Sequence, residues 1–141
     1  MADDAGDFAR SMSIATSGLR AQAGRMRVIS ENIANADSTA PTAGGDPYRR
    51  KVPTFSAALD RSLDARVVTL GKVRPDQSAF RVKHEPGNPA ADAAGNVKYP
   101  NVNPLVEMTD MREAQRSYEA NLNIISATRR MIQRTLDILK A

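Results

Sequence analysis

The sequence predicts a mainly α fold, in which two long terminal helices pair as a coiled-coil hairpin and a small β-containing middle segment joins them. Apolar residues recur at steps of three, four and seven along both ends of the chain, as they do on helices that face a partner helix. All eight prolines lie between Pro41 and Pro104, so proline interrupts neither terminal helix. These observations predict three parts: a helix within 1–39, a Pro-rich middle at 40–103 and a helix within 104–141.

The N-terminal helix is predicted by a seam that alternates steps of four and three, with Gln22 as its only polar member. The seam consists of Phe8, Met12, Ala15, Leu19, Gln22, Met26, Ile29, Ile33 and Ala36. Gly18 and Gly24 lie inside this helix, and each costs about 1 kcal/mol relative to alanine. Two interpretations stay open: close packing of backbone against backbone at the glycines, or a segment that is disordered alone and folds on assembly.

The middle segment is predicted to contain a short helix and a β-hairpin. Residues 55–63 are expected to be helical, and residues 48–52 extended because Pro53 disfavours helix at the residue before it. Residues 66–70 and 79–83 are expected to be two paired strands, with Gly71 and residues 75–78 turning the chain between them. Residues 40–46 and 85–103 are expected to be loops. Turn-forming residues should end the first helix, namely Asn32, Asn35, Asp37 and Ser38.

The C-terminal helix is predicted from Leu105 to Ala141, because no proline or glycine interrupts this stretch. At about 1.5 Å per residue it would span roughly 50 Å, more than a core of this size requires. The seams of the two helices are therefore predicted to form an assembly interface. Its members are Met12, Leu19, Met26, Ile29, Ile33, Met111, Tyr118, Leu122, Ile125, Ile132, Leu136 and Leu139.

No catalytic, cofactor-binding or metal site is expected, so the chain is not predicted to be an enzyme. Cysteine is absent and His84 is the single histidine, which excludes thiolate chemistry and two-histidine metal sites. A Ser-His-carboxylate triad would need His84 as its base, but we interpret His84 as a partly exposed residue of a basic strand. Glu107, Asp110 and Glu113 share helical spacing, and we interpret them as acids that complement the positive end of a helix dipole.

The excess of bases over acids lies in the middle of the chain. The net charge is +4, and residues 40–103 hold ten bases against six acids, whereas both ends are nearly balanced. The run Arg49-Arg50-Lys51 could bind a phosphate or an acidic partner, but short charge runs are usually solvated, and we favour that interpretation. Nucleic-acid binders group bases and aromatics on one helix or groove, a pattern that is missing here. A basic coiled-coil scaffold or nucleic-acid-binding module remains the alternative function.

The start of the chain does not have the pattern of a secretory signal. Asp3, Asp4 and Asp7 precede any apolar run, and no basic region is present before it. No apolar stretch approaches 18 residues. We therefore expect neither a cleaved signal peptide nor direct membrane insertion.

Several motifs resemble those of bacterial flagellar rod and hook axial proteins. The most specific is the run Ser30, Glu31, Asn32, Ile33, Ala34 and Asn35. Further matching stretches are Tyr48–Lys51, Tyr99–Asn103, Met111–Asn121 and Thr135–Leu139. Together with the short middle segment, these motifs are most similar to the proximal rod subunits of the flagellar basal body.

This resemblance implies a structural protein whose terminal helices pack as a coiled-coil layer in a helical tube. It implies partners that include copies of the chain itself, other rod subunits and the flagellar type III export apparatus, with no nucleic acid. It places the chain in the basal body, in the periplasm-spanning rod that connects motor and hook. The loop at 40–46 looks like an insertion relative to the family pattern.

Overall fold

The computed structural model describes residues 2–140, with side chains from residue 6 onward. Helix α1 covers Ala2–Ala34 and helix α2 covers Pro104–Lys140. Six strands lie between them in sequence and form three two-stranded antiparallel sheets. The predicted outline, with one helix at each end and a small β segment between them, is confirmed.

The chain divides into two compact units, and each unit takes a part of both helices. Unit 1 comprises Met1–Arg25, Thr54–Lys72 and Glu113–Ala141, and unit 2 comprises Met26–Pro53 and Val73–Arg112. These units group segments that are distant in sequence. The predicted division at residues 39 and 103 follows the order of the chain, and it stays a prediction.

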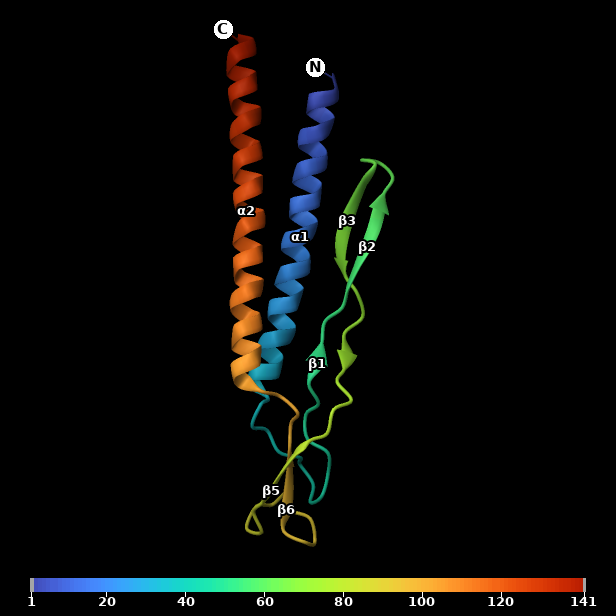
Figure 1. Cartoon of the computed structure of the whole chain (residues 1–141), viewed down its shortest axis with the longest axis vertical. Coiled ribbons are helices and arrows are strands. Elements are labelled where there is room, and N and C mark those ends of the chain that lie inside the picture. The colour runs from blue at the N-terminus through green and yellow to red at the C-terminus, as the bar shows by residue number, and fades with distance from the viewer. Residues whose placement is uncertain (1, 141) are drawn as a thin grey trace. The chain divides into compact units, whose positions relative to one another are not determined.

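In unit 1, α1 lies beside α2 on one side and beside the β2–β3 hairpin on the other (Figure 1). A Cβ atom built on Gly18 would lie 2.8 Å from the side chain of Asn121 on α2, and one on Gly24 would lie 2.6 Å from Leu70 on β3. Both glycines therefore admit a neighbouring side chain, so the packing is close, but it is not the backbone-to-backbone contact of the first interpretation. Whether the segment is disordered before assembly stays open. The first turns of α1 and the last turns of α2 lie at the same end of this unit.

Strands β2 (Phe55–Asp60) and β3 (Ala65–Leu70) form a hairpin in which Phe55 opposes Leu70. The predicted helix at 55–63 is therefore wrong. The alanines and leucine of residues 55–60 suit a helix. Pairing with β3, which contains β-branched residues, decides the conformation instead, because strand formation depends on cross-strand partners. Asp60 accepts hydrogen bonds from the amide and hydroxyl of Ser62, and Asp64 adopts a φ of 46°, which together make the turn.

Unit 2 contains two further pairs of strands. Strand β1 (Lys51–Val52) pairs with β4 (Arg74–Pro75), and β5 (Arg81–His84) pairs with β6 (Asn96–Tyr99). The predicted strand at 66–70 lies within β3, and the one at 79–83 is shifted, because β5 begins at Arg81. The predicted pairing between them is wrong because each has a different partner. The loop predicted for 85–103 is also corrected, since residues 96–99 form β6.

Local chemistry explains the helix boundaries. Pro104 occupies the first position of α2, where no amide hydrogen is needed, and Asn103 caps the helix by accepting a hydrogen bond from the Leu105 amide at 3.1 Å. Helix α1 ends at Ala34, and residues 35–37 form a turn. Asn32, which we expected among the residues that end the helix, lies inside its last turn, and the seam member Ala36 lies beyond it.

The cores of the two units differ in the size of their side chains. In the described part of unit 1 the buried apolar residues are all alanines: Ala15, Ala21, Ala65 and Ala114. Unit 2 buries larger apolar residues as well, among them Val28, Ile29, Val97 and Val102. Because the free energy of burial grows with apolar area, about 25 cal/mol per Å², unit 2 gains more per residue from its own core.

Candidate functional site

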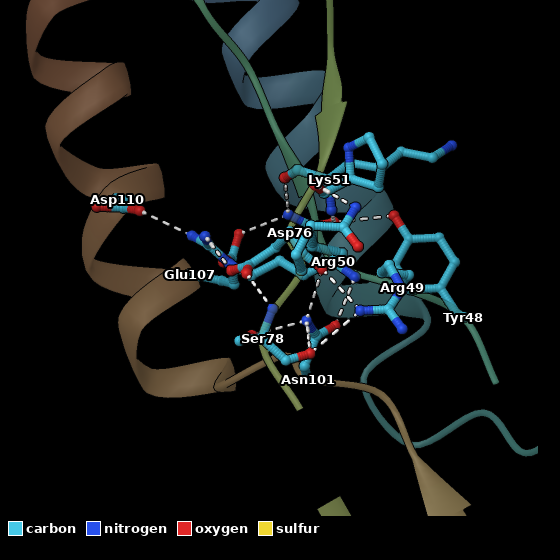
Figure 2. Close-up of polar contacts among 12 residues, drawn as sticks. Tyr48, Arg49, Arg50, Lys51, Asp76, Ser78, Asn101, Glu107 and Asp110 are labelled. Atoms are coloured by element: carbon cyan, nitrogen blue, oxygen red, sulfur yellow. Dashed lines mark hydrogen bonds and ion pairs between the residues drawn. The ribbon is translucent and has the colours of Figure 1, made fainter. Parts of the chain in front are cut away.

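A cluster of polar side chains occupies the centre of unit 2 and is drawn in Figure 2. We call it the Glu107 cluster, and it consists of Asn32, Tyr48, Arg50, Lys51, Asp76, Asn101, Glu107 and Asp110. These residues come from the end of α1, the β1 region, the β4 region, the loop before α2 and the first turns of α2. The cluster thus joins five separate stretches of the sequence.

Glu107 is the most buried charged residue of this cluster, with 1% of its surface exposed. It accepts a hydrogen bond from Arg50 Nε at 2.6 Å and another from Asn32 Nδ2 at 3.0 Å. Glu107 does lie in the first turn of α2, as the dipole interpretation requires. Its main contacts, however, are a buried ion pair and a buried amide, which that interpretation did not include.

Asn32 is equally buried, at 1% exposure, and uses both ends of its amide. Its Nδ2 donates to the Lys51 carbonyl at 2.8 Å as well as to Glu107, and its Oδ1 accepts from Tyr48 OH at 2.8 Å and from the Lys51 amide at 2.9 Å. All its hydrogen-bonding capacity is thereby satisfied, as a buried amide requires. Asn32 therefore fixes the position of residues 48–51 against the end of α1.

Arg50 connects Glu107 to the rest of the cluster. Its guanidinium lies 3.4 Å from Asp76 and 3.8 Å from Asp110, and its amide donates to Asn101 Oδ1 at 2.8 Å. Burial alone would lower the pKa of Arg50, but the hydrogen bonds and charges of Glu107 and Asp76 together outweigh it and raise this pKa. Hydrogen bonds from the amide and hydroxyl of Ser78 lower the pKa of Asp76, and Arg50 lowers it further.

The basic run at 49–51 is bound within unit 2, so the interpretation of a solvated run is wrong. Arg49 donates to the carbonyls of Asp76 and Ser78 at 2.9 and 3.1 Å and lies 4.1 Å from the centre of the Phe80 ring. Lys51 pairs with Glu31. This engagement also weakens the case for the run as a phosphate or nucleic-acid site, because its charges already have partners.

His84, the single histidine of the sequence, lies in the kind of position predicted for it. His84 is exposed at the end of β5, and its Nδ1 lies 3.3 Å from Asn96 Oδ1. Its neighbours Arg81 and Lys83 on the same strand are also exposed. The expected position of His84, on a basic strand and in contact with solvent, is confirmed.

The predicted interface residues lie at three levels of exposure. Ile29 is buried, whereas Leu122, Leu136 and Leu139 are 42%, 44% and 63% exposed. The others are half-buried: Met12, Leu19, Met26, Ile33, Met111, Tyr118, Ile125 and Ile132. Their role in assembly stays a prediction.

The part of α2 that is most buried in unit 1 is a stripe of smaller side chains. Ala114 and Thr128 are 0% and 2% exposed, and Asn121, which packs on Gly18, lies midway between them at steps of seven. Each of these residues follows a predicted seam member by three positions. The larger apolar residues therefore border the buried stripe, and several of them stay accessible on the subunit.

No single motif in the sequence indicates the Glu107 cluster. Asn32 belongs to a motif and suits a helix end, Glu107 suits the positive end of a helix dipole, and Asn101 belongs to another motif. Asp76 belongs to a predicted turn. The one available signal was that all the motif stretches 30–35, 48–51 and 99–103 contain polar residues, and the fold brings these stretches together in unit 2.

Comparison with known proteins identifies the family. Residues 12–40 match the family model of the flagella basal body rod protein, and residues 93–138 match that of the flagellar basal body rod FlgEFG protein C-terminal region. The first match contains the motif at 30–35, and the second contains β6 and nearly all of α2.

Full-length relatives agree with these matches. The flagellar basal-body rod protein FlgC of Agrobacterium fabrum is 54% identical over 128 residues, which cover 91% of this chain and 92% of the relative. FlgC of Bacillus subtilis is 38% identical, covering 92% and 97%, and FlgC of Salmonella typhimurium is 40% identical, covering 89% and 92%. The chain therefore belongs to the FlgC family of flagellar basal-body rod proteins.

Proposed function

We propose that this chain is a structural subunit of the proximal rod that polymerises through packing of its terminal helices and so transmits torque from motor to hook. Its relatives are named flagellar basal-body rod proteins, and the chain is accordingly a structural protein of the flagellar basal body and not an enzyme. The coiled-coil pairing of the terminal helices is part of this proposal.

The observation that carries the proposal is the exposure of large apolar side chains on α2 in unit 1. They are Leu122, Ile124, Met131, Leu136, Ile138 and Leu139, with exposures from 42% to 75%. The alanine core of unit 1 cannot cover them. Fully burying an exposed side chain of this size contributes about 1.5–3 kcal/mol, and covering the exposed part of these side chains contributes about half of that. Contact between subunits would therefore stabilise both the interface and unit 1 itself.

The partners that we propose are copies of the chain, other rod subunits and the flagellar type III export apparatus. Extended helical surfaces related by a screw operation can repeat without closing, which is the geometry that a rod needs. Export without a cleaved signal peptide and a place in the periplasm-spanning rod are proposed with them. Within the described residues, neither helix is both long and apolar enough to span a membrane.

Leu122→Asp tests this proposal. Leu122 is 42% exposed in the subunit, so aspartate is tolerated in the free chain, but it would place an unpaired charge in the dry interface. We expect the variant to be exported but absent from purified basal bodies, with loss of swimming motility.

Asn123→Asp is the matched control, since it adds the same charge at the next residue of α2, an exposed polar position that lies about 100° around the helix from Leu122. It should leave rod incorporation unchanged. Normal motility and rod incorporation of Leu122→Asp would contradict the helical interface. Absence of the wild-type chain from basal bodies would contradict the function as a whole.

A further inference from the structure

We propose that the outer edge of strand β2 binds strand β5 of a second copy of this chain, which adds a third strand to the β2–β3 hairpin. The inference rests on the proposed function, because it requires copies of the chain to meet in the rod. It adds a β-strand contact to the helical packing proposed above.

The backbone register shows which groups of β2 point outward. Ala57 opposes Val68, and the Val68 amide donates to Ser17 Oγ on α1 at 3.1 Å. Opposite residues of an antiparallel pair alternate between bonded and non-bonded pairs, so Ala57 and Val68 form a non-bonded pair. The bond from the Gly71 amide to the Thr54 carbonyl, 2.7 Å, fits this register. The amides and carbonyls of Phe55, Ala57 and Leu59 therefore point away from β3.

The outer edges of β2 and β3 have different surroundings. The outer edge of β3 is turned toward α1, where Ser17 accepts its Val68 amide, whereas β2 has β3 as its one strand partner in the described structure. Exposed edges are normally protected by lysine, proline or a bulge, but residues 55–59 contain no charged residue and no proline. Phe55 and Leu59 are 44% and 58% exposed beside this edge. The edge is therefore suited to accept a strand.

A second β2 does not fit an assembly that continues. Two β2 edges meeting antiparallel would be related by a two-fold axis and would close as a dimer, whereas a rod needs contacts between different surfaces. Strand β5 offers a different surface. All four of its residues are exposed, and Val82 is 60% exposed.

Strand β5 also has an outer edge whose backbone groups can pair with another strand. The Glu85 amide donates to the Gly95 carbonyl at 2.8 Å, so the bonded pairs with β6 involve residues 81, 83 and 85. The backbone groups of Val82 and His84 therefore point away from β6. Outward groups on both strands allow Ala57 of one copy and Val82 of the next to form a hydrogen-bonded antiparallel pair.

The side chains are complementary in this register. Val82 would lie beside Ala57 on the apolar face, between Phe55 and Leu59. On the opposite face, Arg81 would lie next to Ala58 and diagonal to Asp60. Its Nε and Nη2 donate to the Pro100 and Ala36 carbonyls of its own subunit, so Nη1 is the group that would face the Asp60 carboxylate. Apolar residues thus meet apolar residues, and a base lies diagonal to an acid.

Cysteine cross-linking tests the register directly, because the natural chain has no cysteine. Opposite residues of a bonded antiparallel pair have Cα atoms about 5.5 Å apart, which a disulfide can span. A chain carrying both Ala57→Cys and Val82→Cys should give a ladder of disulfide-linked copies when basal bodies are oxidised. The control pair Ala58→Cys and Val82→Cys should give at least tenfold less, since residue 58 lies on the other face.

Two outcomes overturn the inference. One is the absence of a ladder from 57/82 chains that are present in basal bodies, and the other is a cross-linked dimer from Ala57→Cys alone, which would show pairing of β2 with itself. Absence of the wild-type chain from basal bodies would instead refute the proposed function.

Proline variants give a second measurement that needs no cysteine. Ala57→Pro removes an amide that points outward and leaves the β2–β3 bonds intact, so the purified chain should unfold at the wild-type temperature while its recovery in basal bodies falls at least tenfold. Ala58→Pro removes an amide of the hairpin and should lower the unfolding temperature. Wild-type recovery of Ala57→Pro would also overturn the inference.

Discussion

Asn32, Arg50 and Glu107 come from three separate parts of the chain and complete one another's hydrogen bonds. The sequence does not predict which residues they bind, because hydrogen bonds between residues 57 and 75 positions apart leave no local pattern. Motif membership drew attention to Asn32, while the favoured interpretation of the run 49–51 pointed away from Arg50. The residue types thus indicated the structural importance of Asn32 but not that of Arg50.

Replacing Glu107 should destabilise unit 2 strongly. Glu107→Gln removes a carboxylate charge that is 1% exposed and leaves Arg50, whose side chain is 22% exposed, with the ion pairs to Asp76 and Asp110. Loss of this charge-assisted hydrogen bond costs about 1.5–3 kcal/mol. Urea unfolding of the purified chain measures the change in the free energy of unfolding.

Glu113→Gln is the control for this substitution. Glu113 pairs with Arg25 at 3.5 Å, but its side chain is 65% exposed, and exposed pairs contribute at most about 1 kcal/mol. Equal losses of stability for the two variants would contradict the structural importance of the Glu107 cluster.

Tyr48 should make stability depend on alkaline pH. Burial, together with the charges of Glu31 and Glu107, raises the pKa of Tyr48 to about 12, compared with about 10 for an unfolded tyrosine. Between these values the folded chain retains a proton that the unfolded chain loses, so the free energy of unfolding falls as pH rises from about 10 to about 12. Below pH 10 this contribution is fully present.

The measurement is urea unfolding at several alkaline pH values for the wild-type chain and for Tyr48→Phe. The variant lacks the ionisable hydroxyl, so its stability should fall less steeply over the same range. Since the pKa of Tyr99 is also raised, through its hydrogen bond to Glu85, the difference between the two chains is the relevant quantity. Parallel curves would contradict the assignment to Tyr48.

At the scale of elements, the helices were predicted well and the strand pairings were not. Long periodic stretches without proline specify helices locally, and α1 and α2 follow them closely. The region 55–60 contains residues that suit a helix, yet it forms β2 because β3 lies opposite. Pairing of β5 with β6, rather than with β3, likewise depends on contacts that short-range signals do not contain.

On the scale of the whole molecule, the two units differ in how much stability their own cores provide. Unit 2 buries valine, isoleucine and the side chains of Asn32 and Glu107, whereas the buried apolar residues described in unit 1 are alanines. The free energy of local unfolding varies across a protein with such differences in packing. Unit 1 should therefore be less stable in the free subunit and gain stability in the rod.

Hydrogen exchange of the soluble chain tests this difference within single helices. Amides of α1 before residue 25 should exchange faster than those of residues 28–34, and amides of α2 after residue 113 faster than those of residues 108–112. Mass spectrometry of peptides from the two parts of each helix measures the exchange rates. Equal protection along α1 would contradict unequal stability of the units.

The sequence by itself determined the two helices, their approximate ends, the absence of proline from them and membership of the rod family. These properties depend on local periodicity and on motifs, which are read along the chain. Only the tertiary structure decided how the strands pair, that Arg50 of the basic run is bound to the buried Glu107, and that Asn121 of α2 packs on Gly18 of α1. Those outcomes depend on which distant residues meet, and desolvation then favours the partners that satisfy each buried charge and amide.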